Sequence, residues 1–393
     1  MRLTTTGIAN NIDQSVVGRI TTRPLADRSE TIIVTTALTG LDGYRGIVTT
    51  NQDRVTSTAR IPAIYAVREI EHLHDGDIVA MHTRGLVRTL FINGSKHNVL
   101  FVTERCNSNC LMCSQPPRDR EDTKALIRLN HELIDLIPRD TPHLVITGGE
   151  PTLLGDDLIR LIEHLRNRLP CTCICVLTNA RQFARPDYTA RFAGVQHPNL
   201  VVGVPLYSDS STSHDYIVQS RGAFDETITG VHHLARWNFS VEIRLVLHRL
   251  TIPRLLKWAD FVYRNLPFTT HVALMGMEPT GFARYHHDKL WIDPLEYQGA
   301  LADTVEFLSI RGMTVSVYNL QYCVLPRSLW PYARQSISDW KRIFLPACDE
   351  CARRGDCAGF FESTEPQHTR GVQALPIGES AGNLGSRIPR IAE

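Results

Sequence analysis

Residues 101–113 read FVTERCNSNCLMC, and this stretch decides how the rest of the chain is interpreted. It follows an apolar run and places Cys106, Cys110 and Cys113 with three and then two residues between them. A closed structural zinc site takes four ligands, and no histidine lies at the usual short spacing to complete one. A [4Fe-4S] cluster that only carries electrons also takes four thiolates. Three thiolates therefore indicate a metal site with one open position, where a cofactor or substrate can bind.

The same stretch opens a series of alternating strands and helices. The apolar strands NVLFVT, HLVITGG, CICVLTNA, NLVVGVPLYS, SVEIRLVLH, THVALMG and TVSVYN are separated by amphipathic helical segments such as 122–138 and 156–170. Repeated βα units imply parallel strands with crossover helices. About six units predict an α/β fold, a partial (β/α)6 barrel of the TIM type, over residues 97–319. Barrel enzymes keep their chemistry at the C-terminal ends of the strands, where the cysteine loop falls.

The flanking regions have different patterns. In residues 1–96, short apolar runs separated by turn dipeptides such as Asp42-Gly43 and Asn93-Gly94 predict a small, mostly β domain. Residues 320–363 hold a second cysteine cluster. Residues 364–393 contain many Gly, Ser and Pro residues and predict a poorly ordered tail.

Composition narrows the class of protein. A formal net charge of +1 over 393 residues gives no reason to expect nucleic acid or an anionic membrane as partner. The N-terminal MRLTTTGIANN is not a secretory signal, and no apolar run is long enough to span a bilayer, so we expect a cytoplasmic protein. Of the ten cysteines, seven fall into two closely spaced clusters. The other three alternate in CTCICVLTN and predict a buried strand rather than a metal site.

A second motif stands at the end of the next strand, in TGGEPT at residues 147–152. Two glycines let the backbone approach a ligand closely and can present N–H groups toward it. The carboxylate of Glu150 suits an ammonium group. A Gly-Gly pair alone is usually a turn, but its place at the top of the strand after a three-cysteine loop makes the combination specific.

CNSNCLMC together with GGEPT resembles the radical S-adenosylmethionine (SAM) superfamily. The resemblance implies that Cys106, Cys110 and Cys113 hold a [4Fe-4S] cluster whose fourth iron is chelated by the amino and carboxylate groups of SAM. One electron from the cluster would split SAM into methionine and a 5′-deoxyadenosyl radical, which takes a hydrogen atom from the substrate. The cofactor-binding residues of the second motif would be Gly148, Gly149, Glu150 and Pro151.

Three further strand-end residues resemble the ribose and carboxylate contacts of this family: Asn179 in LTNA, Ser208 in VPLYSD and Arg244 in VEIRLV. Each also has an ordinary structural interpretation. Asn179 can cap a turn, Ser208 can satisfy turn backbone groups, and Arg244 can pair with a nearby carboxylate.

The sequence identifies no catalytic residue. Glu278 and Asp209 lie at strand ends, where a structural or polar-lining role is the better interpretation. His214 and Asp215, in SHDY, fit the start of a surface helix.

The second cluster, CDECARRGDC, places Cys348, Cys351 and Cys357 at two and five intervening residues, and Cys323 can supply a fourth thiol. Spacing does not separate zinc from iron and sulfur. Beside a radical SAM core, the arrangement resembles the twitch extension, a shortened SPASM domain, which implies one auxiliary [4Fe-4S] cluster. Four thiolates would saturate that cluster and favour electron transfer; without Cys323, an open iron could bind substrate.

Two longer strings, NVLFVTERCNSNCLMCSQPPR and CVLPRSLWPYARQSISDWKRIFLPACDEC, resemble the C-type maturase of His-Xaa-Ser peptide systems. The resemblance implies post-translational modification of a ribosomally made peptide with His-Xaa-Ser repeats. It also implies a paired radical SAM enzyme and an electron donor such as a flavodoxin or ferredoxin. No such triplet occurs in this chain, so the substrate would be a separate polypeptide, which the N-terminal domain could hold by strand addition.

Two alternatives stay open. One is a twitch-containing radical SAM cyclase that acts on a small molecule or nucleotide. The other is a non-enzymatic, zinc-braced binding protein, which predicts a basic face that the weak charge excess does not support.

Overall fold

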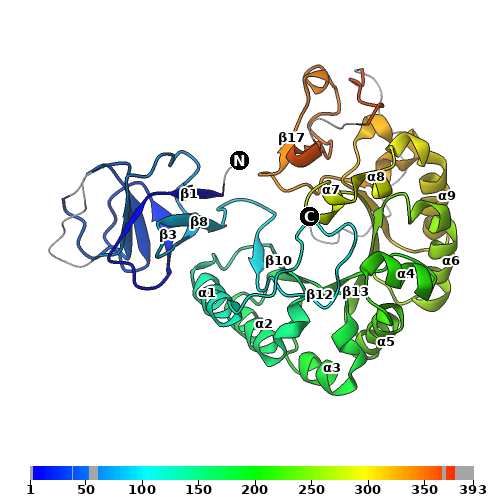
Figure 1. Ribbon diagram of the computed structural model, residues 1–393, viewed down its shortest axis with the longest axis horizontal. Helices are drawn as coiled ribbons and strands as arrows, with labels where there is room; N and C mark the ends of the chain where they lie inside the picture. The colour runs from blue at the N-terminus through cyan, green and yellow to red at the C-terminus, as the bar shows by residue number, and fades with distance from the viewer. Residues whose placement is uncertain (1–2, 38, 53–60, 365–368, 377–393) are drawn as a thin grey trace.

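The computed structural model describes residues 3–37, 39–52, 61–364 and 369–376 (Figure 1). Within these residues the strands form two eight-stranded sheets and one two-stranded sheet. No helix in the described ranges is long and apolar enough to cross a bilayer.

The larger unit is an α/β structure whose sheet is parallel throughout, in the order β16-β15-β14-β13-β12-β11-β10-β9. The strands are β9 (Val99–Phe101), β10 (His143–Thr147), β11 (Cys173–Leu177), β12 (Leu200–Pro205), β13 (Ser240–Leu247), β14 (His271–Gly276), β15 (Val315–Tyr318) and β16 (Ala333–Arg334). The predicted α/β class with a parallel sheet is therefore confirmed.

The helices follow the strands, and the longer ones lie in an arc along the outer side of the curved sheet (Figure 1). They are α1 (Thr123–Leu136), α2 (Asp156–Arg168), α3 (Pro186–Ala193), α4 (Ser211–Val218), α5 (Ala223–Arg236), α6 (Leu255–Asn265), α7 (Phe282–Tyr285), α8 (His287–Leu290) and α9 (Gln298–Ser309). Short 3-10 turns include η1 (Pro151–Leu154), η2 (Arg181–Ala184), η4 (Pro294–Glu296), η5 (Tyr322–Val324) and η7 (Pro346–Cys348).

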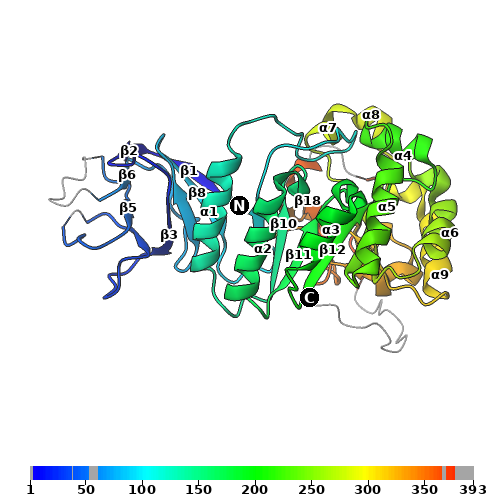
Figure 2. The same cartoon turned by 90° about the horizontal axis from the view of Figure 1, so that it is seen from below.

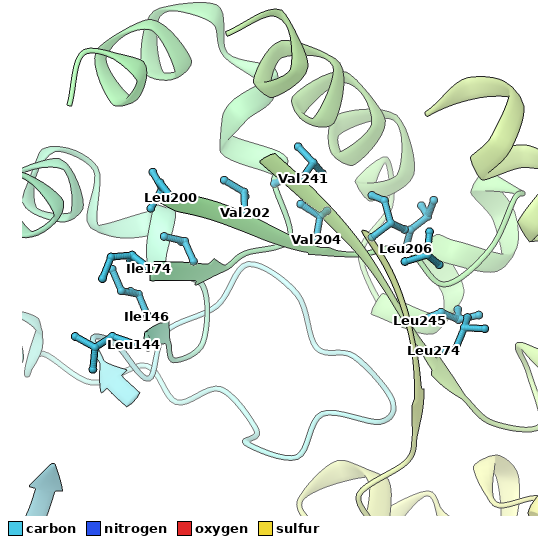
Figure 3. Packing of buried hydrophobic residues seen from close by; sticks show 14 of the residues in the cluster. Leu144, Ile146, Ile174, Leu200, Val202, Val204, Leu206, Val241, Leu245 and Leu274 are labelled. Carbon is cyan, nitrogen blue, oxygen red and sulfur yellow. The ribbon is translucent and has the colours of Figure 1, made fainter. Parts of the chain in front are cut away.

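The core of this unit lies between the sheet and the helices. Every second strand residue is fully buried there, including Leu144, Ile146, Ile174, Val202 and Val241 (Figure 3). Because successive strand side chains point to opposite faces, the intervening residues point to the inner face of the sheet, where polar groups can gather.

The alternating cysteines behave partly as predicted. Cys175 is buried in β11, with Ile174 on the opposite face. Cys171, however, is exposed and precedes the strand, which begins at Cys173, so the buried segment is shorter than the sequence indicates.

The N-terminal sheet has the order β1-β8-β7-β3-β4-β5-β6-β2. Its strands are β1 (Thr4–Thr6), β2 (Ile8–Asn10), β3 (Val16–Thr21), β4 (Thr31–Val34), β5 (Gly46–Val48), β6 (Ala63–Tyr65), β7 (Ile78–Met81) and β8 (Leu86–Phe91).

One continuous segment, residues 4–10, covers both ends of this sheet. Its first half pairs with β8 and its second half with β6, and the switch is at Gly7. A Cβ at Gly7 would lie 2.4 Å from the Tyr65 carbonyl oxygen, so only glycine fits this close approach. Residues 4–10 thus occupy the edges of β6 and β8 to which a substrate peptide would have to add. This removes support for strand addition of a peptide at β6 or β8.

The N-terminal sheet packs against α1 (Figure 2). Val17, Ile78 and Phe91 belong to the same apolar cluster as Leu133 of α1. The guanidinium of Arg19 also donates to the C-terminal carbonyl of that helix at Leu136, at 2.6 Å. Because the apolar core is continuous, this sheet is attached to the α/β unit over a shared surface.

The C-terminal region contains a small antiparallel sheet of β17 (Arg342–Ile343) and β18 (Phe360–Phe361). The sequence predicts a poorly ordered tail from residue 364, and the structure describes residues 369–376 of it. Thr369 and Leu375 are buried, because the polar groups of this segment find partners on the α/β unit. Residues 365–368 and 377–393 of the predicted tail lie outside the described residues.

Candidate functional site

The three-cysteine site, Cys106, Cys110 and Cys113, opens into a cavity of about 220 Å³. The cavity lies at the C-terminal ends of the parallel strands, and Gly149 and Glu150 line it with the thiols. The two sequence motifs, which are separated by one βα unit, therefore meet in space.

Backbone hydrogen bonds hold the cysteine loop on two sides. The Asn109 and Leu111 N–H groups donate to the carbonyls of Val218 and Ile217 at the end of α4, at 3.0 and 2.9 Å. On the other side, the Phe282 N–H donates to the Cys113 carbonyl at 2.8 Å. The loop is therefore positioned by α4 and α7, neither of which contains a residue of the two motifs.

Arg181 fixes the same loop from inside the cavity. Its Nη1 donates to the Asn107 carbonyl at 2.6 Å and to Ser220 Oγ at 2.9 Å, and its Nε donates to Glu226 Oε2 at 2.5 Å. Only 13% of the Arg181 side chain is exposed, so its ion pair with Glu226 is screened by water less than a surface pair. Arg181 thus joins the cysteine loop to α5.

The thiols lie in a poorly hydrated environment. Burial, followed by the nearby charge of Glu150, raises the pKa of Cys106 to about 11. Burial also raises the pKa of Cys110 and of Cys113. Thiolates at these positions need a bound cation for their stability, and metal binding would therefore release protons.

The donor set fits an iron–sulfur cluster better than a single ion. Within the described residues, no group of three His, Cys, Asp or Glu side chains converges closely enough to hold one metal ion. The thiolates of a [4Fe-4S] cluster bind different irons, so they need not converge on one point. Three partly buried thiols around a cavity meet that requirement.

The Gly-Gly pair is packed against the cysteine-bearing segment. A Cβ at Gly149 would lie 2.1 Å from the Arg105 carbonyl oxygen, which requires glycine. The Gly149 N–H donates to the Thr103 carbonyl at 2.7 Å, and the Glu150 N–H donates to the Arg105 carbonyl at 2.8 Å. The expectation that these N–H groups point toward a ligand is therefore not met at Gly149, where the donor is used within the protein.

Glu150 is 1% exposed and its carboxylate already has four protein donors. Oε1 accepts from the Thr152 N–H at 3.0 Å, from Thr152 Oγ1 at 2.6 Å and from Thr178 Oγ1 at 2.6 Å. Oε2 accepts from the Asn179 N–H at 2.7 Å. Burial raises the Glu150 pKa, while these hydrogen bonds oppose the shift. Since a carboxylate has about four acceptor positions, Glu150 can accept from all four donors, and it braces two segments: its own turn at Thr152 and the loop at Thr178 and Asn179.

Two of the three strand-end candidates line the cavity. The Asn179 side chain donates to Asn107 Oδ1 at 2.6 Å, which ties it to the cysteine loop. Arg244 lines the cavity but pairs with Glu242, and its Nη2 lies 3.2 Å from Met275 Sδ. Burial would raise the pKa of Glu242, but Arg244 and His271 outweigh it and lower that pKa to about 2.

Ser208 and Pro151 are not among the lining residues of the cavity. Ser208 Oγ accepts from the Ser210 N–H at 3.2 Å and caps a turn. Pro151 is buried at the first position of η1. Gly148 directly precedes the lining residue Gly149, and a Cβ there would lie 2.3 Å from the Thr103 carbonyl.

The acidic candidates are both paired with cations. Asp209 accepts from Arg254 Nε and Nη2 at 2.7 and 2.6 Å. Glu278 accepts from Lys341 Nζ at 3.0 Å, which links the end of β14 to the C-terminal region. Neither carboxylate lines the three-cysteine cavity.

His214 was expected on a surface helix, and that expectation is wrong. It is 2% exposed, lines the cavity and accepts the Tyr207 N–H on Nδ1 at 3.2 Å. Burial lowers its pKa to about 4, so it is neutral near neutral pH. Its neighbour Asp215 accepts the Gly222 and Phe224 N–H groups and fixes the start of α5. No motif in the sequence singled out Arg181 or Tyr207, which also line the cavity.

The second cysteine cluster also comes together. All four thiols line one small cavity of about 20 Å³, which we call the four-cysteine site: Cys323, Cys348, Cys351 and Cys357. They come from η5, from η7 and from the loop that leads to β18. The cysteine separated most widely in sequence, Cys323, therefore joins the other three.

Comparison with known proteins agrees with the interpretation of the cysteine loop and the Gly-Gly-Glu segment. The sequence profile of the Radical SAM superfamily matches residues 100–262. These residues are thus similar in sequence to radical SAM domains. The match covers β9 to α6 and includes the three-cysteine site and the Gly-Gly-Glu segment, and it speaks against the non-enzymatic alternative.

Two curated relatives match about half of the chain. The GTP 3′,8-cyclase of Petrotoga mobilis is 27% identical over 216 residues, which cover 53% of this chain and 64% of that protein. An uncharacterized protein of Archaeoglobus fulgidus is 22% identical over 197 residues, covering 50% of this chain and 43% of that one. The chain thus spans less than two thirds of the length of either relative.

Similar solved structures have low sequence identity to this chain. Streptococcus suis SuiB is 16% identical, with a TM-score of 0.46 over 58% of this chain and 50% of SuiB. A radical SAM methyltransferase from Sphaerobacter thermophilus is 16% identical, with a TM-score of 0.43 over 62% of this chain and 73% of the other.

Proposed function

We propose that this protein is a radical SAM enzyme whose three-cysteine site holds a [4Fe-4S] cluster, within a partial (β/α)6 barrel of the TIM type. One observation carries the proposal. The three thiols, Gly149 and Glu150 line a single cavity at the C-terminal ends of parallel strands, inside the segment that matches the superfamily.

The residues of this chain have distinct tasks in that proposal. Arg181 and Asn179 hold the cysteine loop, and Glu150 braces the segment that faces it. SAM would bind against Gly148 to Pro151 and against Asn179, Ser208 and Arg244. When bound, the cluster would supply one electron that splits SAM and yields a 5′-deoxyadenosyl radical.

We further propose that residues 320–363 form a twitch-like region whose four-cysteine site holds one auxiliary [4Fe-4S] cluster. The support is that all four thiols line one cavity, although Cys323 is distant in sequence from the others. Four thiolates would saturate the cluster, which suits electron transfer. The N-terminal β domain, residues 1–96, would be an accessory unit of the enzyme.

For the substrate we propose a ribosomally made peptide with His-Xaa-Ser repeats, modified in the cytoplasm with a paired radical SAM enzyme and a flavodoxin or ferredoxin as electron donor. The support is the resemblance of the two longer strings around the cysteine clusters to that maturase family.

A cyclase acting on a nucleotide is the second candidate. The match to the GTP 3′,8-cyclase, at 27% identity over 216 residues, is the observation in its favour.

The first test is metal and cofactor chemistry on anaerobically isolated protein. Two [4Fe-4S] clusters predict about eight irons per chain. Replacing Cys106, Cys110 and Cys113 by alanine should halve the iron and abolish 5′-deoxyadenosine formation. Cleavage of SAM that persists in this variant would refute the assignment of the three-cysteine site.

The second test separates the substrates. The enzyme is incubated with SAM, a reductant and either a His-Xaa-Ser repeat peptide or GTP, and the products are analysed by mass spectrometry. A mass change in the peptide that accompanies 5′-deoxyadenosine supports the maturase. Conversion of GTP with an unchanged peptide supports the cyclase instead.

A further inference from the structure

Residues 369–376 cross the four-cysteine site, and we call them the strap. Gln373 and Leu375 line the small cavity with the four thiols. Thr369 and Leu375 are each 7% exposed, so the strap is packed at both ends.

The buried end of the strap is anchored on Asp293, at the start of η4. Asp293 Oδ1 accepts from Thr369 Oγ1 at 2.6 Å, and Oδ2 accepts from the Arg370 N–H at 3.0 Å. Arg370 also reaches Glu296 Oε1 at 3.0 Å, but its side chain is 71% exposed and this pair contributes little. The Asp293–Thr369 contact is buried, so we assign the anchor to it.

The other end of the strap presents a backbone donor to sulfur. The Leu375 N–H lies 3.4 Å from Cys351 Sγ, and the Leu375 carbonyl accepts the Ala352 N–H at 2.9 Å. One of the four thiols thus receives a hydrogen bond from a segment that lies beyond the cysteine motif itself.

An N–H donor stabilises negative charge on the sulfur it contacts. A reduced cluster carries one more electron than the oxidised one, so the donor stabilises the reduced form more and raises the reduction potential. Hydrogen bonds and burial around a metal site are the means by which a protein sets that potential.

We propose that the strap raises the reduction potential of the auxiliary cluster by donating the Leu375 N–H to Cys351. The inference rests on the proposed auxiliary cluster. It gives residues 369–376 a tuning role that no cysteine spacing indicates.

The test compares Leu375→Pro with Leu375→Ala in the full chain. Proline removes the N–H and keeps the carbonyl that accepts from Ala352, whereas alanine keeps both groups. Reduction potentials of both clusters are measured by anaerobic titration followed by electron paramagnetic resonance, with the cluster at the three-cysteine site as internal reference. Leu375→Pro should change the reduction equilibrium of the auxiliary cluster by about tenfold, or 59 mV toward negative values. Leu375→Ala should leave it unchanged.

An unchanged potential in Leu375→Pro, or a shift to positive values, overturns the tuning role. Loss of the auxiliary irons in Leu375→Pro also overturns it, because the strap would then only hold the site together. If the unmodified protein binds about four irons rather than eight, the auxiliary cluster itself fails, and this inference with it.

Discussion

Replacement of Glu150 tests how the Gly-Gly-Glu segment is held against the loop that follows β11. Glu150→Ala removes the acceptor of the Thr152 and Asn179 N–H groups and of the Thr152 and Thr178 hydroxyls. The hydroxyls can rotate toward other acceptors, but the two buried N–H groups cannot. Each buried donor without a partner costs about 1–3 kcal/mol. We therefore expect the free energy of unfolding to fall by about 2–6 kcal/mol.

Glu150→Gln is the more informative variant, because it keeps the shape of the side chain. The amide oxygen can replace Oε1, which leaves the amide NH₂ facing the Asn179 N–H across the present 2.7 Å contact. The loss of one hydrogen bond to a charged group predicts a decrease of about 1.5–3 kcal/mol. Glu163→Gln, on the exposed face of α2, is the matched control and should change the unfolding free energy by less than about 0.5 kcal/mol.

The assay is urea unfolding of the metal-free protein, followed by circular dichroism. The variants are also tested for SAM binding after iron loading. If Glu150→Gln has the stability of the Glu163→Gln control, the bracing role assigned to Glu150 is wrong.

Three further changes test other parts of the site. Arg181→Met should reduce the iron held at the three-cysteine site while the four-cysteine site keeps its own, and Arg181→Lys should have a smaller effect; iron per chain measures both. Gly149→Ala places a Cβ 2.1 Å from a backbone oxygen and should destabilise the protein by about 1–3 kcal/mol, whereas Gly299→Ala, with open space around it, should be neutral or stabilising by urea unfolding. Glu242 has a folded pKa of about 2 against an ordinary 4.5, so it contributes about 3 kcal/mol at pH values above 4.5 that is lost as the pH falls toward 2. The measurement is urea unfolding of the metal-free protein at pH 5 and at pH 3. The unfolding free energy should fall less over this range in Glu242→Gln than in the unmodified protein, and the two falls should differ by about 3 kcal/mol at most.

The sequence was sufficient for the parts of the molecule that depend on local pattern. The alternation of strands and helices predicted a parallel α/β sheet, which the structure confirms. The motifs around Cys106 and Gly149 predicted a resemblance to radical SAM domains, and the superfamily profile matches residues 100–262. In both cases the residues that carry the information are neighbours in sequence.

The features of the fold and the site that the sequence did not predict depend on contacts between segments far apart in the chain. Arg181 holds a loop more than seventy positions earlier in the chain, and His214 is buried because α4 packs over the cavity. The composition of the tail gave no sign that Thr369 would meet Asp293. Such convergence leaves no periodic pattern or short motif, so the sequence alone could not show it.

The way the N-terminal sheet is completed affects the order of folding. Thr4 pairs with Arg88 and Ile8 pairs with Tyr65. The first segment of the sheet therefore cannot complete its pairing until the last strand has been made. During synthesis, this sheet can close only after β8 has left the ribosome. Its pairings are non-local in sequence, and high contact order makes folding slow. Until closure, the edges of β6 and β8 are open to pairing with other chains, which is the stage at which a chaperone would be of most use.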